Sequence, residues 1–311
     1  METLKTPHLL VIGGTGFIGH HLLKASLQKD WQVSSVSLNP PTKGRFVDGV
    51  SYLHLDLTDR LLVKESLGED FDYVVNLGGY INHQLFRDGG RELIEMHFTA
   101  LKNMLEVLSR RKLKRFVQIG SSDEYGNAPA PQHEEMREQP ISPYSLAKTA
   151  STHFLQMLYR TENFPAVTLR LFLTYGPGQD SGRFLPQIIR GCLDDAVFPT
   201  SAGEQLRDFC YVDDIVRGIF QALTLTVATG EVFNIASGEA VSIHAMIEKI
   251  CALTDSGKPQ YGKIPYRPGE NMSLFASVSK AKKVLQWKPL ISLEEGLTKT
   301  INSFVVDNGY G

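Results

Sequence analysis

The sequence of 311 residues carries 32 basic and 34 acidic side chains, and this near balance gives no electrostatic reason to expect a nucleic-acid partner. Its 42% hydrophobic and 21% charged residues are typical of a globular protein large enough for one main domain and a smaller lobe. No apolar run is long enough to cross a bilayer, so we expect no membrane contact. The three widely spaced cysteines indicate neither a disulfide framework nor a zinc site, so we expect a cytoplasmic protein without a metal.

The chain begins with a strand, a glycine turn and a helix. Residues 9–12 form a short apolar run, which is typical of a buried parallel strand, and residues 13–19 read GGTGFIG before an apolar-periodic helix. Backbone N–H groups in such a turn can bind a pyrophosphate at the positive end of the helix. We therefore expect a dinucleotide to be bound by Gly13, Thr15, Gly16, Phe17, Ile18 and Gly19.

The second strand, residues 33–38, should end beside the adenosine ribose of that dinucleotide. A carboxylate at this point favours NAD, whereas basic residues suit the 2′-phosphate of NADP. The sequence places Ser37 and Asn39 there, followed by Lys43 and Arg45. Because no carboxylate is present, we expect NADP, with NAD as the alternative.

Strands and helices then alternate through residues 51–55, 61–67, 73–77, 92–109, 115–120 and 166–171. Such alternation predicts an α/β fold with a doubly wound parallel sheet, whose ligand crevice lies at the carboxyl ends of the strands. Asp56 with its neighbour Leu57, and the group Leu77, Gly78 and Gly79, follow strands at that edge and are expected to contact the dinucleotide.

A helix over residues 143–163 carries the candidate acid–base pair. Ser142 is a suitable N-cap and Pro143 a suitable first residue, and Tyr144 and Lys148 lie four residues apart on one face. A nearby ammonium favours the ionised phenol, so we expect Lys148 to lower the pKa of Tyr144. Residues 120–122, Gly-Ser-Ser, precede this helix and supply a hydroxyl partner in Ser121 or Ser122.

Beyond residue 172 the composition shifts toward glycine and proline, and the strict alternation ends. Helices are expected over residues 184–192, 212–225, 243–253 and 293–304. We therefore assign residues 1–172 to the dinucleotide-binding domain and residues 173–311 to a smaller lobe, while allowing the chain to cross back between them.

Taken together, these motifs resemble the extended short-chain dehydrogenase/reductase family, in particular its nucleotide-sugar epimerases, dehydratases and ketoreductases. The likeness extends over residues 13–19, 56–57, 120–126, 144–148, 175–179, 207–214, 234–238, 267–269 and 285–289. It implies a Rossmann sheet with a C-terminal α/β substrate lobe for a nucleoside-diphosphate sugar, and a homodimer formed through residues 92–109 and 144–163. By the same resemblance Tyr144 is the catalytic acid and base, Lys148 binds the nicotinamide ribose, and Ser121 or Ser122 bonds the reacting oxygen.

The resemblance also suggests which sugar chemistry follows. In 4,6-dehydratases a Thr precedes an Asp-Glu pair, but aligning Tyr125-Gly126 here puts Ser122 and Asp123 at the pair's positions. We therefore expect reduction of an NDP-4-keto-6-deoxyhexose with NADPH; 4-epimerisation, and then dehydration, are the alternatives. Asp123 and Glu124 are expected to bind sugar hydroxyls, and the pyrophosphate is expected to contact Arg183, Arg207 and Arg267.

A regulator that senses the cofactor without chemistry would share the first half of this sequence. Such proteins typically lose the Tyr or the Lys, and both are present here as Tyr144 and Lys148. His83 and His97 receive no functional role, because an isolated histidine is more often structural.

Overall fold

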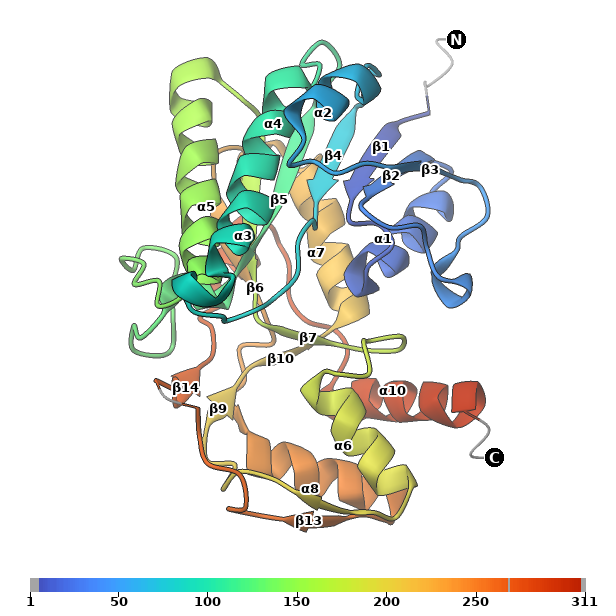
Figure 1. Ribbon diagram of the computed structural model, residues 1–311, viewed down its shortest axis with the longest axis vertical. Helices are drawn as coiled ribbons and strands as arrows, with labels where there is room; N and C mark the ends of the chain where they lie inside the picture. The colour runs from blue at the N-terminus through green and yellow to red at the C-terminus, as the bar shows by residue number, and fades with distance from the viewer. Residues whose placement is uncertain (1–5, 268, 309–311) are drawn as a thin grey trace.

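A parallel sheet forms the centre of the molecule. The computed structural model describes residues 6–267 and 269–308, and within them seven strands pair in the order β11-β6-β5-β4-β1-β2-β3, each neighbour parallel (Figure 1). The order reverses between β1 and β4, which creates the crevice expected at this point in doubly wound sheets. The strands are β1 His8–Ile12, β2 Gln32–Ser37, β3 Val50–His54, β4 Tyr73–Asn76, β5 Arg115–Ser121, β6 Ala166–Leu171 and β11 Val232–Ile235.

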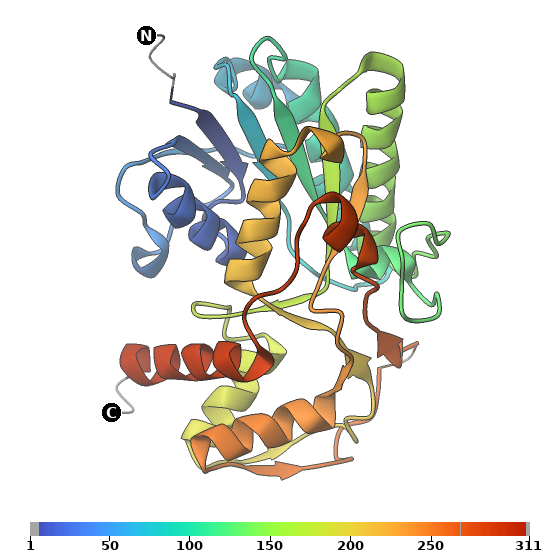
Figure 2. The same cartoon turned by 180° about the vertical axis from the view of Figure 1, so that it is seen from behind.

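Helices cover both faces of this sheet because alternate strand side chains enter separate cores. Leu9 and Val11 of β1 enter one core, whereas Leu10 and Ile12 enter the other. The second core packs against α2 (Arg60–Ser66), α4 (Ala100–Val107) and α5 (Pro143–Glu162). The opposite face carries α1 (Phe17–Leu27), α7 (Val212–Thr224) and α9 (Ser279–Val284), which lie in front in Figure 2.

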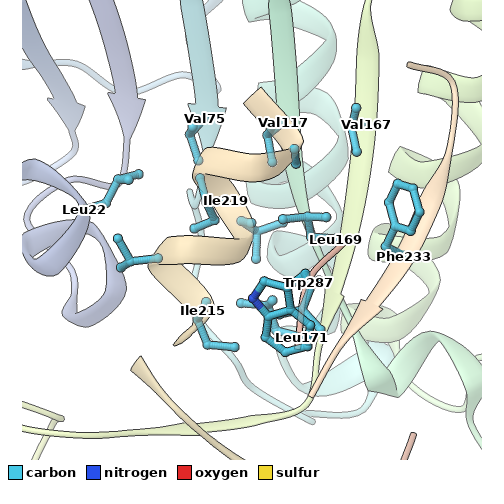
Figure 3. Packing of buried hydrophobic residues seen from close by; sticks show 14 of the residues in the cluster. Leu22, Val75, Val117, Val167, Leu169, Leu171, Ile215, Ile219, Phe233 and Trp287 are labelled. Atoms are coloured by element: carbon cyan, nitrogen blue, oxygen red, sulfur yellow. The ribbon is translucent and has the colours of Figure 1, made fainter. Parts of the chain in front are cut away.

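Helix α7 provides much of the apolar contact on that opposite face. Figure 3 shows its side chains Ile215 and Ile219 lying against strands that carry Val75, Val117 and Leu169. Trp287 packs beside them; its ring is fully buried and its indole N–H donates to the Asp214 carbonyl at 3.0 Å. Residues from the second half of the chain therefore complete the core of the first domain.

The smaller lobe is built from α6 (Phe184–Leu193), α8 (Ile243–Thr254) and α10 (Leu293–Asn308). Short strands support these helices and link them to the main sheet: β7 Leu173–Tyr175, β8 Val197–Pro199, β9 Leu206–Arg207, β10 Phe209–Tyr211, β12 Val241–Ser242, β13 Lys258–Gln260 and β14 Ser273–Leu274. The buried Asp208 carboxylate accepts backbone N–H bonds from Ser237, Gly238 and Ala276, so it ties the connections between the lobes together.

The lobes are not divided cleanly at residue 172. β11 pairs with β6 in the main sheet, and α7 and α9 pack on that sheet although they follow residue 172. The helix expected over residues 92–109 also differs. It is composed of α3 (Gly90–Ile94), the π-helical turn η3 (Glu95–Thr99) and α4, and the π-helical turn changes the direction of the side chains it carries.

Candidate active site

The glycine turn after β1 packs closely against the loop after β4. Gly13 has a φ of +77°, and a Cβ atom there would lie 3.1 Å from the carbonyl carbon of Leu77. A Cβ atom on Gly19 would lie 2.3 Å from the Gly13 carbonyl oxygen, which only glycine permits. The structure thus brings the turn and residues 77–79 together at the reversal of strand order, as the sequence predicts.

The N-terminus of α1 faces this turn. Gly16 is its N-cap in an extended conformation, and within the described residues no side chain caps the N–H groups that follow, including those of Phe17 and Ile18. Such N–H groups, together with the helix dipole, bind phosphate. The glycine cradle and the uncapped helix end therefore fit a dinucleotide pyrophosphate.

The end of β2 provides polar groups beside the cradle. The Thr15 backbone N–H donates to Ser37 Oγ at 3.4 Å, which holds the turn against β2. Asn39 and Lys43 are exposed on the connection that follows, and Lys43 begins the short 3₁₀ helix η1 (Lys43–Arg45). Their side chains are accessible to a ribose or its 2′-phosphate.

Arg45 is directed elsewhere. Its guanidinium donates to the Thr15 carbonyl at 3.2 Å, to the Gly178 carbonyl at 2.9 Å and to the Asp180 carboxylate at 2.6 Å. It therefore bridges the glycine turn and the loop before α6 in the smaller lobe. His21 makes a parallel link, because its Nε2 donates to the Pro177 carbonyl at 2.9 Å. In this structure the Arg45 guanidinium joins the lobes, and its expected contact with a 2′-phosphate stays a prediction.

The loop after β3 is ordered by its own polar contacts. Asp56 Oδ1 accepts from the backbone N–H and the hydroxyl of Thr58, at 2.8 and 2.7 Å. Asn103 of α4 donates to the Leu57 carbonyl at 3.0 Å. Asp56 is exposed at the carboxyl edge of the sheet, where the sequence placed it.

Tyr144, Lys148 and Ser121 come together at the carboxyl end of β5. Ser142 caps α5 through its hydroxyl, which accepts from the Ser145 N–H at 3.1 Å, so the helix begins where the sequence predicts. Tyr144 and Lys148 are buried, with the Lys148 Nζ 5.8 Å from the centroid of the Tyr144 ring. The Ser121 side chain lies close enough to the Tyr144 phenol to lower the pKa of that phenol, which makes Ser121 the hydroxyl partner.

The electrostatics of this group differ from the expectation for Tyr144. Burial raises the pKa of its phenol above the ordinary value, and the Asp123 carboxylate adds to this increase while the Ser121 hydrogen bond opposes it. Burial lowers the pKa of Lys148 to about 8, and the Glu124 carboxylate opposes that decrease. The protein part of the site thus favours the neutral phenol, because burial outweighs the lowering of the Tyr144 pKa by Ser121 and Arg183.

The acidic residues of the turn η4 (Ser122–Tyr125) separate into different environments. Asp123 is half-buried, and its Oδ2 lies 3.8 Å from the His83 ring nitrogen. Burial raises the pKa of Asp123, and the charges of His83 and Arg207 oppose this. Glu124 is fully buried, with its oxygens bonded to Ser121 N, Thr152 and Arg170. The expected sugar contact of Glu124 is therefore replaced by an interior role, while Ser122 is also buried.

The sequence reading missed His97 and His83, whose rings contact Tyr144. His97 lies in η3 with its ring centroid 5.0 Å from that of Tyr144, and its Nε2 donates to the Tyr80 carbonyl at 3.0 Å. The His83 ring centroid lies 5.9 Å from that of Tyr144. Burial lowers the pKa of His97 to about 3. One feature of the sequence could have indicated a role for His97: residue 97 lies in the helix that follows the glycine-rich end of a strand.

The expected pyrophosphate arginines approach the crevice from the smaller lobe. Arg183 is the N-cap of α6, and its charge acts on Tyr144. Arg207 is largely buried, pairs with Glu270, and has its pKa lowered by burial. Arg267 is exposed, and its charge acts on Arg207. Arginines of the smaller lobe therefore place positive charge near Tyr144 and Asp123.

The described part of the chain shows neither a metal-binding cluster nor a membrane-spanning helix. Residues 6–267 and 269–308 contain no cluster of His, Cys, Asp and Glu suited to a metal ion. Within the same ranges, no helix combines the length and apolar character required to span a membrane.

The sequence matches a known protein family and several of its members. The model of the NAD dependent epimerase/dehydratase family matches residues 9–236. A probable dTDP-glucose 4,6-dehydratase of Sinorhizobium fredii is 26% identical over 336 residues, covering 97% of this chain and 93% of that protein. A UDP-N-acetyl-alpha-D-glucosaminuronate decarboxylase of Bacillus cytotoxicus is 28% identical, covering 95% of this chain and 97% of the relative.

A solved structure shares the fold over nearly the whole chain. The UDP-glucose 4-epimerase of Thermotoga maritima, solved with UDP-glucose, is 25% identical and superposes with a TM-score of 0.88. The alignment covers 97% of this chain and 99% of that one.

Proposed function

This chain belongs to the NAD dependent epimerase/dehydratase family, and from that membership we propose that it epimerises a nucleoside-diphosphate hexose at C4. It is an NAD-dependent enzyme that modifies nucleotide sugars. The observation that carries the proposal is the convergence of Tyr144, Ser121 and Lys148 beside the glycine cradle. Redox chemistry at a carbinol carbon requires this arrangement, because the attached oxygen must exchange a proton.

The roles of the side chains follow from their positions. Tyr144 accepts the proton of the C4 hydroxyl during oxidation and returns it to the same oxygen when the ketone is reduced from the opposite face, while Ser121 bonds that oxygen. The Lys148 ammonium stabilises the phenolate form of Tyr144 that accepts this proton, because its charge lies near the Tyr144 ring. NAD, held by the glycine cradle, supplies the hydride acceptor and donor.

The environment of Glu124 argues against elimination of water. Dehydration needs an acid and a base that both reach the sugar, but the Glu124 oxygens are bonded in the interior to Ser121, Thr152 and Arg170. Asp123 remains as a crevice carboxylate that can accept bonds from sugar hydroxyls. Redox exchange at C4 needs no carboxylate pair, so it suits this site better.

The Arg45 bridge supports a cofactor that stays bound between turnovers. Arg45 joins the Thr15 carbonyl of the cradle to Gly178 and Asp180 of the smaller lobe. A bridge across the cradle hinders release of a dinucleotide held beneath it. An epimerase regenerates its cofactor in each cycle and gains from this retention.

Reduction of an NDP-4-keto-6-deoxyhexose by NADPH is the second candidate. It is favoured by the exposed Asn39 and Lys43 at the end of β2, where no carboxylate would repel a 2′-phosphate. This reaction uses the same Tyr144 and Ser121, but the oxidised cofactor must leave after each turnover.

The experiment that separates these candidates measures both sugar and cofactor. Purified protein is incubated with UDP- and dTDP-hexoses and their 4-keto-6-deoxy derivatives, and the products are identified by NMR. Interconversion of C4 epimers without net change in NADH absorbance supports the proposal. Consumption of NADPH with the keto sugars establishes the reductase, and loss of water from a hexose establishes a dehydratase.

We also propose a homodimer through the α3 to α5 surface. Leu146 of α5 is 50% exposed and Met157 is 38% exposed, while the Phe98 and Phe154 rings pack together between η3 and α5. Apolar exposure along one helix is typical of an interface. Light scattering should give twice the 34.6 kDa chain mass, and Leu146→Glu should shift it toward the monomer.

A further inference from the structure

Glu124 occupies the interior of the molecule in a position prepared for its carboxylate. Its Oε1 accepts from the Ser121 backbone N–H at 2.9 Å, and its Oε2 accepts from the Thr152 hydroxyl and from Arg170 Nε, each at 2.9 Å. A Cβ atom on Gly120 would lie 2.4 Å from Oε1, so the glycine leaves the space that this oxygen occupies. The carboxylate therefore contacts β5, α5 and β6 together.

This network meets the candidate catalytic group at the end of β5. The Lys148 ammonium donates to the Ile119 carbonyl at 2.9 Å, and Glu124 accepts from the N–H of Ser121, two residues further along. Thr152 follows Lys148 by one turn of α5, so Lys148 and Thr152 lie on the same face of the helix. Glu124 and Lys148 therefore hold neighbouring peptide groups of the strand that delivers Ser121.

We propose that Glu124 is a positioning residue that fixes the backbone of Ser121 and supplies the negative charge that keeps the buried Lys148 as an ammonium ion. Its effect on turnover rests on the proposed function, whereas its effect on Lys148 does not. The Arg170 guanidinium, itself fully buried, balances the Glu124 charge from β6 and also pairs with Glu138 at 2.5 Å.

The charges around Lys148 support this role. Burial lowers the pKa of Lys148 to about 8, and Glu124 is the charge that opposes this decrease. From η3, His97 faces Lys148 as a neutral ring, because burial lowers its pKa to about 3. From its own helix, Tyr144 faces Lys148 as a phenol whose pKa is raised by burial. Without Glu124, Lys148 would lose its proton closer to neutral pH.

If Glu124 and Arg170 had only a structural role, the expected result would be different. Glu124 and Arg170 could only join η4 to β6, and their loss would then lower the melting temperature without changing the titration of Lys148. The direct measurement is therefore the protonation of Lys148 in the protein without substrate. Lysine labelled with ¹³C at Cε reports this by NMR, and the Lys148 signal is the one missing from Lys148→Arg.

The test compares Glu124→Gln with the matched control Glu138→Gln. Both remove a carboxylate partner of Arg170, but Glu138 lies on the loop before α5 and has no contact with Ser121 in the described residues. We expect the Lys148 midpoint to fall by roughly half a pH unit or more in Glu124→Gln. In Glu138→Gln it should remain at the wild-type value.

A second variant covers the case in which Glu124→Gln does not fold. Glu124→Gln combined with Arg170→Gln removes both members of the buried pair, while Glu138, the other partner of Arg170, keeps its contact with His153. The Lys148 midpoint of this double variant should also lie below wild type. An unchanged midpoint in a folded Glu124 variant, or an equal decrease in Glu138→Gln, overturns the proposal. In an active enzyme the pH profile of kcat should move to lower pH with Glu124→Gln. Wild-type protein that converts no NDP-hexose, with the Lys148 shift intact, would reject the proposed function alone.

Discussion

Lys148 and Tyr144 share a face of α5, but the lysine is anchored to the sheet rather than to the phenol. Its Nζ lies 5.8 Å from the Tyr144 ring centroid and donates to the Ile119 carbonyl at 2.9 Å. The ammonium therefore acts on the phenol through space, and β5 sets its position. Substitutions that disturb the end of β5 should affect both residues together.

Tyr144→Phe should remove the proton-transfer group and leave the binding surfaces intact. We expect kcat to fall about 100- to 10,000-fold, as is usual for the loss of a general acid or base. Binding of NAD, measured by calorimetry, should change little because the ring remains. Tyr159→Phe on the same helix is the matched control and should keep full activity. Retained turnover in Tyr144→Phe would contradict the assignment of Tyr144.

Gly19→Ala should close the dinucleotide cradle. Its Cβ atom would lie 2.3 Å from the Gly13 carbonyl oxygen, so α1 must move away from the turn. We expect NAD affinity to fall by at least about tenfold. The melting temperature should also fall, because the free energy of unfolding decreases by roughly 1–3 kcal/mol. Gly44→Ala, where a Cβ atom meets nothing within 4 Å, provides the control and should match wild type in both measurements.

Asp180→Asn should weaken the bridge between the cradle and the smaller lobe. The Arg45 guanidinium would keep its carbonyl acceptors but lose the carboxylate at 2.6 Å. We expect faster release of NAD, measured by chasing labelled cofactor with excess unlabelled cofactor, and a smaller change in hexose affinity. Glu106→Gln removes a surface carboxylate that pairs with Arg60 at 2.6 Å and serves as the control. Equal release rates in all three proteins would mean that the bridge does not retain the cofactor.

Lys148 should make the free energy of unfolding depend on pH above neutrality. Its pKa is about 8 in the folded protein against the ordinary 10.5, so between these values the unfolded chain binds more protons and stability rises with pH. The full contribution is on the order of 3 kcal/mol. The stability of Lys148→Met relative to wild type, from urea unfolding, should therefore decrease from pH 8 to pH 10.5. A constant difference would indicate an unshifted lysine.

The sequence predicted the features that depend on local pattern. The apolar run of β1, the glycine turn and the Ser142 cap each follow from residues that are neighbours in the chain, and the structure places them as expected. The family assignment and the parallel sheet were confirmed by the family model and the strand order. NADP preference stays a prediction.

The features that the sequence did not predict depend on contacts between distant residues. The interior role of Glu124 requires Arg170 on β6 and Thr152 on α5, and no spacing rule links these positions. His97 reaches Tyr144 because η3 is π-helical, which a regular helical periodicity does not indicate. The bridge of Arg45 to Asp180 crosses between lobes, so it could not be inferred from the β2 loop alone.

The return of the chain to the main sheet limits how this enzyme can be recombined with its relatives. A chimaera that exchanges residues 173–311 as one block would replace β11, which pairs with β6, and α7, whose Ile215 and Ile219 fill the core. The foreign β11 would have to pair with β6, and the foreign α7 would have to pack on a face of the sheet that evolved with a different helix. Exchange of substrate preference by grafting therefore calls for several short splices that leave β11, α7 and α9 in place.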